Sequence, residues 1–162
     1  AILPIVKPTG RRLILEPGRF IVGNAGILVT KVVYVKKHGT KTFIIVDAGM
    51  NDLIRPALYD SFHAIRPIKL SDAEEIVADI VGPICESADR FAKDRKIPKV
   101  NEGDLLAIFS AGAYGFVMSS NYNSRPRVPE VMVIDDTHFI VRERETYEDL
   151  IRGEKIPDIL LK

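Results

Sequence analysis

Short apolar runs separated by turn-forming residues limit most strongly what this chain can fold into. Val-rich residues 27–36 lead through His38-Gly39-Thr40 into residues 41–47, which predicts a β-hairpin. A second hairpin is predicted where residues 130–134 meet 138–142 around Asp135-Asp136-Thr137. Further strands are expected at 13–15, 62–70, 76–84 and 105–109. Turn signals at intervals of about 8–12 residues are typical of a mainly β sandwich or Greek-key barrel with short helices.

Two short helices have recognisable start signals. Residues 51–52 are expected to cap a helix over 53–59, whose proline lies in the first turn. Thr146 and Asp149 have the spacing of a capping box for a terminal helix. The mixed-charge run 142–145 before this helix is predicted to be a solvated edge.

The first 25 or so residues fit the β pattern poorly. A helix end, the strand at 13–15 and the corner at 16–19 are typical of the last βα unit of a parallel barrel. We therefore predict a domain boundary near Gly26. Residues 1–26 would end an N-terminal (β/α)8 barrel that is otherwise missing, and residues 27–162 would form a C-terminal β domain.

Composition excludes several classes of protein. The balance of 23 Lys+Arg against 22 Asp+Glu argues against a nucleic-acid partner, and no apolar run is long enough for a membrane span. The single cysteine excludes an internal disulfide and a cysteine-built zinc site, and it fits a cytoplasmic protein. The three histidines share no metal-ligand spacing, so we predict no metal.

Two arginine-containing motifs suggest anion binding. In the corner at 16–19, Gly18 lets backbone amides approach an anion, and Arg19 supplies a planar fork for carboxylate or phosphate. Arg55 and Tyr59, spaced i and i+4, lie on one face of a helix and could meet one ligand carboxylate. For the corner at 16–19, the structural alternative is a surface turn with a solvated ion pair. For Arg55 and Tyr59, it is an exposed arginine packed over a tyrosine.

A third cluster combines a thiol with small residues. Cys85 is expected at a strand end beside Glu86, where a thiol can donate a proton near neutral pH. The small-residue run 110–115 contains Tyr114, whose phenol could contact a ligand. For Cys85, the alternative is an inert buried cysteine. For the run 110–115, it is a tight packing turn.

Five motifs together carry a family resemblance, and they read EPGR, DAGMND, RPALY, GPICESAD and AGAYG in chain order. This series closely resembles the C-terminal part of the diaminopimelate decarboxylases, pyridoxal-phosphate enzymes of the alanine-racemase-like fold group. The resemblance runs from about residue 13 to 148. Cys-Glu-Ser at 85–87 favours this family over ornithine and arginine decarboxylases, which tend to carry Cys-Asp there.

The resemblance implies a cofactor, a reaction and a partner. Family members pair a pyridoxal-5'-phosphate-binding (β/α)8 barrel with a C-terminal β domain, and they are homodimers with active sites at the subunit interface. The reaction converts meso-2,6-diaminopimelate to L-lysine and CO2, the last step of lysine biosynthesis. The lysine that forms the Schiff base lies on an early barrel strand, so we expect this chain alone to be inactive.

The resemblance also assigns roles to individual residues. Cofactor contacts fall on Glu16, Pro17, Gly18, Arg19 and Tyr114. Substrate contacts fall on Arg19, Arg55, Tyr59, Glu86 and Tyr114. Cys85 would be the proton donor, delivered with Glu86 into the neighbouring subunit's barrel. An ammonium and a carboxylate at the substrate's distal end require an anion and a cationic fork, which Glu86 and the arginines provide.

Two alternatives remain. The chain could be part of a related ornithine- or arginine-type decarboxylase, or a non-catalytic β assembly domain. A pure assembly domain would not need the retained set of polar residues, namely Arg19, Arg55, Tyr59, Cys85, Glu86 and Tyr114.

Overall fold

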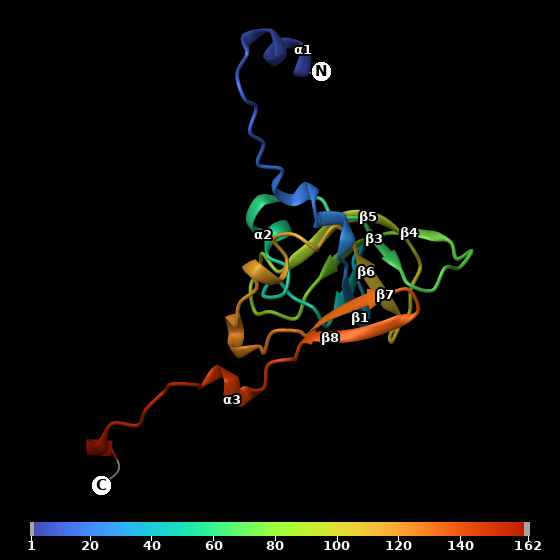
Figure 1. The fold of residues 1–162 in the computed structure, drawn as a ribbon. Coiled ribbons are helices and arrows are strands. Elements are labelled where there is room, and N and C mark those ends of the chain that lie inside the picture. Colours follow the sequence, from blue (N-terminus) through green and yellow to red (C-terminus); the bar gives the residue numbers. More distant parts are fainter. Residues whose placement is uncertain (1, 161–162) are drawn as a thin grey trace.

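The computed structural model describes residues 2–160, and these form a mainly β protein with short helices (Figure 1). The strands are β1 Leu28–His38, β2 Lys41–Val46, β3 Ile65–Pro67, β4 Glu75–Val81, β5 Arg90–Pro98, β6 Leu105–Ile108, β7 Glu130–Ile134 and β8 Thr137–Arg142. The helices are α1 Leu3–Val6, α2 Arg55–Tyr59 and α3 Tyr147–Leu150. This composition confirms the predicted mainly β class.

Six strands form one sheet in the order β3-β6-β1-β2-β4-β5, and its neighbours are antiparallel except for the parallel pair β2 and β4. The two edge strands also approach each other. Arg95 on β5 donates a hydrogen bond to the carbonyl of His63, just before β3, at 2.9 Å. Its guanidinium stacks 4.1 Å from the centroid of the Phe62 ring. The sheet therefore nearly closes into a barrel, as a Greek-key prediction requires.

The inside of this sheet is the hydrophobic core. Most of its fully buried apolar side chains come from β1, β2, β4, β5 and β6, with one from the turn before α2, and they are Val32, Ile44, Val46, Leu53, Ile80, Ile97, Leu106 and Ile108. Branched aliphatic side chains suit this position because they pack well on a pleated surface.

Local signals placed the turns correctly. β1 and β2 form the predicted hairpin around Gly39, whose φ of +58° a glycine adopts without a steric penalty. β7 and β8 form the second predicted hairpin. The Thr146 side chain accepts from the Asp149 amide and the Asp149 carboxylate from the Thr146 amide, which confirms the capping box.

Three local predictions are wrong. Residues 11–17 have no regular structure, so the strand at 13–15 is absent; none of the strands in residues 2–160 pairs with its backbone groups. β3 covers only Ile65–Pro67 of the predicted strand over 62–70. Helix α2 begins at Arg55 without a side-chain cap, because the Asp52 carboxylate instead accepts from the Gly49 amide.

Strand β5 was not predicted. Its charged side chains mostly face solvent, whereas Phe91, Ala92 and Ile97 are buried in the core. Asp94, with a φ of +46°, interrupts the alternation of inward and outward side chains. Because apolar and polar residues do not alternate regularly along β5, the sequence gives no clear strand signal there.

Both chain ends extend away from the six-stranded sheet (Figure 1). The segment carrying α1 leaves on one side, and the segment carrying α3 leaves on another. In the β7–β8 ribbon, apolar side chains are about half exposed or more, among them Val131, Val133, Ile134, Ile140 and Val141. Within residues 2–160, no helix is long and apolar enough to cross a membrane. The boundary near Gly26 remains a prediction.

Candidate functional site

Two arginines and two tyrosines from separate parts of the chain gather beside α2. We call Arg19, Arg55, Tyr59 and Tyr114 the arginine–tyrosine cluster. The Arg55 guanidinium carbon lies 5.3 Å from the centroid of the Tyr59 ring and 5.5 Å from that of the Tyr114 ring. The predicted packing of an arginine over a tyrosine is therefore present, and it includes a second tyrosine from the loop after β6.

Backbone contacts hold Arg19 next to this loop. The amides of Ala111 and Gly112 donate to the carbonyls of Gly26 and Gly23 at 2.9 and 3.1 Å. The Arg19 guanidinium donates to the Ser110 carbonyl at 3.0 Å. The segment after the corner at 16–19 is thus fixed on the loop that carries Tyr114.

Tyr114 itself has an unusual backbone conformation. Its φ of +58° lies in the left-handed region, which costs a bulky side chain on the order of 1–3 kcal/mol. Its hydroxyl lies close to Gly18, where an added Cβ would be 3.5 Å from the phenol oxygen. In this conformation the Tyr114 side chain lies beside Gly18 and Arg55.

The arginine–tyrosine cluster has no internal counter-charge. Within the part of the chain that the structure describes, no carboxylate lies within 4.0 Å of the guanidinium of Arg19 or Arg55. The buried Nε of Arg55 has no hydrogen-bond partner among those residues. Two guanidinium groups without carboxylates make a site that attracts an anionic ligand.

His63, which the sequence analysis assigned to no site, packs beneath this region. It is 1% exposed, and its Nδ1 lies 2.8 Å from the Phe109 carbonyl oxygen. Burial lowers the pKa of His63, and the positive charges of Arg19, Arg55 and Arg95 lower it further, against the effect of that hydrogen bond. A neutral His63 imidazole does not add a positive charge beside the guanidinium groups of the cluster.

The second group of predicted residues lies in the loop between β4 and β5. Cys85 and Glu86 are both exposed at its tip. Glu86 accepts from the Ala88 amide at 3.2 Å and from the Tyr122 hydroxyl at 3.5 Å. Its neighbour Asp89 is buried, and burial raises the pKa of the Asp89 carboxyl although two amide donors lower it.

The two groups do not meet within one chain. Over residues 2–160, Cys85 and Glu86 form no hydrogen bond or ion pair with any member of the arginine–tyrosine cluster. Glu16 and Pro17 are exposed and precede the turn Gly18–Phe20. The structure thus brings together four of the nine predicted residues, with Gly18 beside Tyr114, and shows no hydrogen bond or ion pair from Cys85 or Glu86 to these four.

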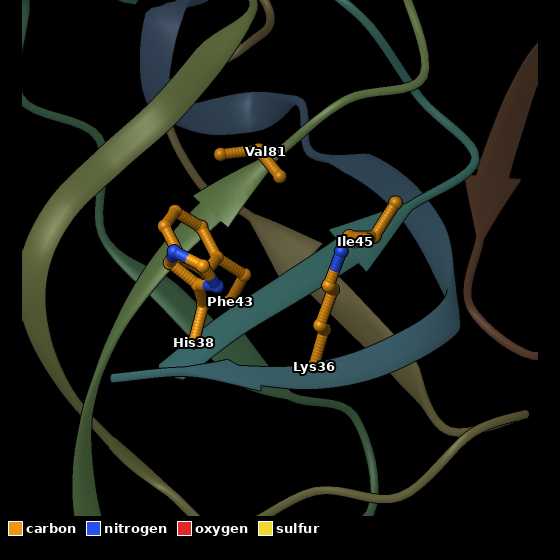
Figure 2. A pocket seen from close by; sticks show the side chains of 5 residues that line it. All are labelled: Lys36, His38, Phe43, Ile45 and Val81. Atoms are coloured by element: carbon orange, nitrogen blue, oxygen red, sulfur yellow. The ribbon is translucent and has the colours of Figure 1, made fainter. Parts of the chain in front are cut away.

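A hollow of about 380 Å³ lies elsewhere, on the outer face of β1, β2 and β4 (Figure 2). It is lined by Lys36, His38, Phe43, Ile45 and Val81. Its lining includes none of the predicted site residues, no thiol or hydroxyl side chain and no carboxylate. No group of three potential metal ligands is found among the described residues.

The arginine–tyrosine cluster suits a phosphorylated cofactor. Gly18 has a φ of +55° and no side chain, so its backbone can approach a phosphate closely. The Tyr114 hydroxyl, close to Gly18, and the guanidinium of neighbouring Arg19 are further donors. The residues present therefore fit the phosphate and hydroxyl groups of pyridoxal 5'-phosphate.

Comparison with known proteins supports this interpretation. Residues 19–112 match the family model described as "Pyridoxal-dependent decarboxylase, C-terminal sheet domain". The chain is similar to the diaminopimelate decarboxylase of Archaeoglobus fulgidus, at 57% identity over 151 residues, covering 93% of this chain and 36% of the relative. For that of Aquifex aeolicus, identity is 55% over 140 residues, covering 86% and 33%. The chain thus spans about a third of the length of these curated relatives.

Solved structures agree with the fold. The diaminopimelate decarboxylase of M. jannaschii in complex with L-lysine superposes with a TM-score of 0.91 at 43% identity, covering 98% of this chain and 37% of that one. The Helicobacter pylori enzyme complexed with L-lysine gives 0.85 at 48% identity, covering 94% and 38%. The six-stranded sheet is therefore similar to a part of these larger enzymes.

Proposed function

Because this chain belongs to the pyridoxal-dependent decarboxylases, as their C-terminal sheet domain, we propose that it is the C-terminal part of a diaminopimelate decarboxylase. The reaction is the conversion of meso-2,6-diaminopimelate to L-lysine and CO2. The observation that carries the substrate choice is the Arg55 guanidinium, which lies against two tyrosine rings and pairs with no carboxylate of residues 2–160. An ornithine or arginine substrate lacks the distal carboxylate that such a group would bind.

Substrate recognition is divided between two surfaces. Arg19, Arg55, Tyr59 and Tyr114 present cationic and phenolic donors to the carboxylates of the substrate. Glu86 presents a carboxylate to its distal ammonium group. Each charge-assisted hydrogen bond contributes about 1.5–3 kcal/mol, enough to discriminate against a substrate that lacks one of these groups.

Proton delivery is the proposed role of Cys85. When CO2 leaves, the bond between the α-carbon and the carboxylate breaks and its electron pair remains on the carbon. Pyridoxal phosphate, when bound, supplies an electron sink for that pair. The exposed Cys85 thiol then gives its proton to the same carbon, forming the new C–H bond, and the thiolate regains a proton from solvent.

Cys85 and Glu86 would serve the active site of a second subunit. The lack of any hydrogen bond or ion pair between the β4–β5 loop and the arginine–tyrosine cluster among the described residues supports this arrangement. We propose a homodimer in which each subunit supplies this loop to its partner. Gly18 and Tyr114 would contact the cofactor, and Glu16 and Pro17 would form the turn leading to it. The reducing environment that suits one exposed thiol supports a cytoplasmic location.

The test is an assay of the full-length protein, loaded with pyridoxal phosphate, on meso-diaminopimelate, ornithine and arginine. We expect kcat/KM to be highest for meso-diaminopimelate by at least ~100-fold. A preference for ornithine or arginine would overturn the substrate choice. Absence of decarboxylation of all three would favour an assembly domain.

A further inference from the structure

Beyond the residues that touch substrate, the loop between β4 and β5 contains a buried carboxylate with a defined role. Asp89 is 4% exposed, whereas Cys85 and Glu86 in the same loop are exposed. One Asp89 oxygen, Oδ2, accepts the amide of Ile84 at 2.7 Å, and Ile84 directly precedes Cys85. The loop that bears the proposed proton donor is therefore closed by its own last residue.

The second oxygen of the same carboxylate reaches another segment. Asp89 Oδ1 accepts the amide of Met50 at 2.7 Å, in the turn between β2 and α2. Helix α2 then carries Arg55 and Tyr59. One buried side chain thus links the loop of Cys85 to the segment that leads into the arginine–tyrosine cluster.

The backbone around Asp89 reinforces this closure. The Gly82 amide donates to the Asp89 carbonyl at 3.1 Å, and the Asp89 amide donates to the Glu86 carbonyl at 3.0 Å. Gly82 leaves the space that the carboxylate occupies, because an added Cβ would lie 2.6 Å from Asp89 Oδ1 and 2.7 Å from the Ala48 carbonyl oxygen. Contacts shorter than 3 Å would force the carboxylate or the backbone to move.

We propose that Asp89 is the positioning residue of the reaction, which holds Cys85 and Glu86 in place and fixes their loop relative to helix α2. This rests on the proposed function, since it assigns Cys85 and Glu86 to catalysis and recognition. Asp89 acts only through the amides of Ile84 and Met50, and it does not touch the substrate. A carboxylate is required because each of its two oxygens accepts one N–H.

The test compares two buried aspartates on the same hairpin in the full-length, cofactor-loaded protein. Asp89→Asn keeps the shape but turns one acceptor into an NH2 group, so one of the two amides loses its partner. Asp79→Asn is the matched control: Asp79 is 7% exposed, accepts the Asp94 amide at 2.6 Å, and lies on β4 away from the loop tip.

We expect two effects in Asp89→Asn that Asp79→Asn does not show. Amide hydrogen exchange in the peptides containing Met50 and Ile84 rises by about 10-fold or more, the change for a lost hydrogen bond of ~1.4 kcal/mol. With meso-diaminopimelate as substrate, the kcat of Asp89→Asn falls at least 10-fold and its KM rises relative to the active wild-type protein. If Asp89→Asn does not fold, Asp89→Ser, whose smaller hydroxyl leaves room for water, carries the same comparison.

The outcomes separate this proposal from the proposed function. Exchange and kinetics of Asp89→Asn that match those of Asp79→Asn would overturn the role of Asp89, even though the wild-type protein decarboxylates its substrate. Faster exchange with unchanged kcat and KM would also overturn it. A wild-type protein that does not act on meso-diaminopimelate, with Asp89→Asn still loosening the loop, would overturn the proposed function instead.

Discussion

The guanidinium carbon of Arg55 lies 5.5 Å from the centroid of the Tyr114 ring, which joins helix α2 to the loop after β6. No strand pairing connects these two segments directly. The cation–π contact places Arg55 beside the ring of Tyr114, whose hydroxyl in turn lies close to Gly18. Stacking on two tyrosine rings holds Arg55 without an ion pair to a carboxylate of the described residues, as the proposed role in binding a ligand carboxylate requires.

The first prediction concerns Arg55. In the full-length protein, Arg55→Lys should lower kcat/KM for meso-diaminopimelate by about 10- to 100-fold, because an ammonium cannot present a bidentate fork to a carboxylate. Steady-state kinetics measure this. Arg66→Lys is the control, since Arg66 is an exposed arginine that likewise lies over an aromatic ring, that of Phe109, and was assigned no site role. A change below threefold in Arg55→Lys would contradict the recognition role.

The second prediction concerns Cys85. Cys85→Ala should reduce kcat at least ~100-fold, the usual scale for a lost acid–base group, and change the affinity for substrate much less. Ser87→Ala is the matched control because Ser87 is exposed two residues further along the same loop. Near-normal turnover of Cys85→Ala in the full-length, cofactor-loaded protein would remove Cys85 from the reaction.

Sequence alone predicted those features that depend on neighbours along the chain. The β1–β2 and β7–β8 hairpins and the box of Thr146 and Asp149 follow from local turn and capping chemistry. Identifying the candidate site residues required the ordered motifs, because Arg55 and Tyr59 at i and i+4 alone do not distinguish a ligand site from a packed surface pair.

What sequence could not predict depends on distant contacts. β5 is hidden because its charged face and the bulge at Asp94 remove the strand period. The roles of His63 and Asp89 depend on segments that meet only after folding: the carbonyl of Phe109 for His63 and the amide of Met50 for Asp89. A buried aspartate looks like any charged loop residue until its donors are known.

The third prediction concerns Gly112, where the segment after Arg19 packs on the loop after β6. An added Cβ would lie 2.8 Å from the Gly26 amide nitrogen and closer still to the Val22 carbonyl oxygen. Gly112→Ala should therefore destabilise the protein by about 1–3 kcal/mol, measured by thermal unfolding. Gly23→Ala, whose Cβ would come no closer than 3.5 Å to Arg19, should have a smaller effect. Equal unfolding temperatures for the two variants would refute the tight backbone contact.

The fourth prediction concerns Glu145, which the sequence analysis placed in a solvated charged run. The hydrogen bond from the Arg127 guanidinium, helped by the Arg127 amide and Asn121, lowers the pKa of Glu145 from 4.5 to about 2. Because the folded-state pKa is the lower one, this stabilisation is present above pH 4.5 and is lost as the pH falls toward 2. Glu145→Gln should thus lower the unfolding temperature at pH 7 by about 2–4 °C and flatten its dependence on pH in that interval.

Thermal unfolding from pH 2 to 7 measures both effects, with the exposed Glu143→Gln as the control. A pH profile of Glu145→Gln as steep as that of the control would show that the pair with Arg127 does not stabilise the fold.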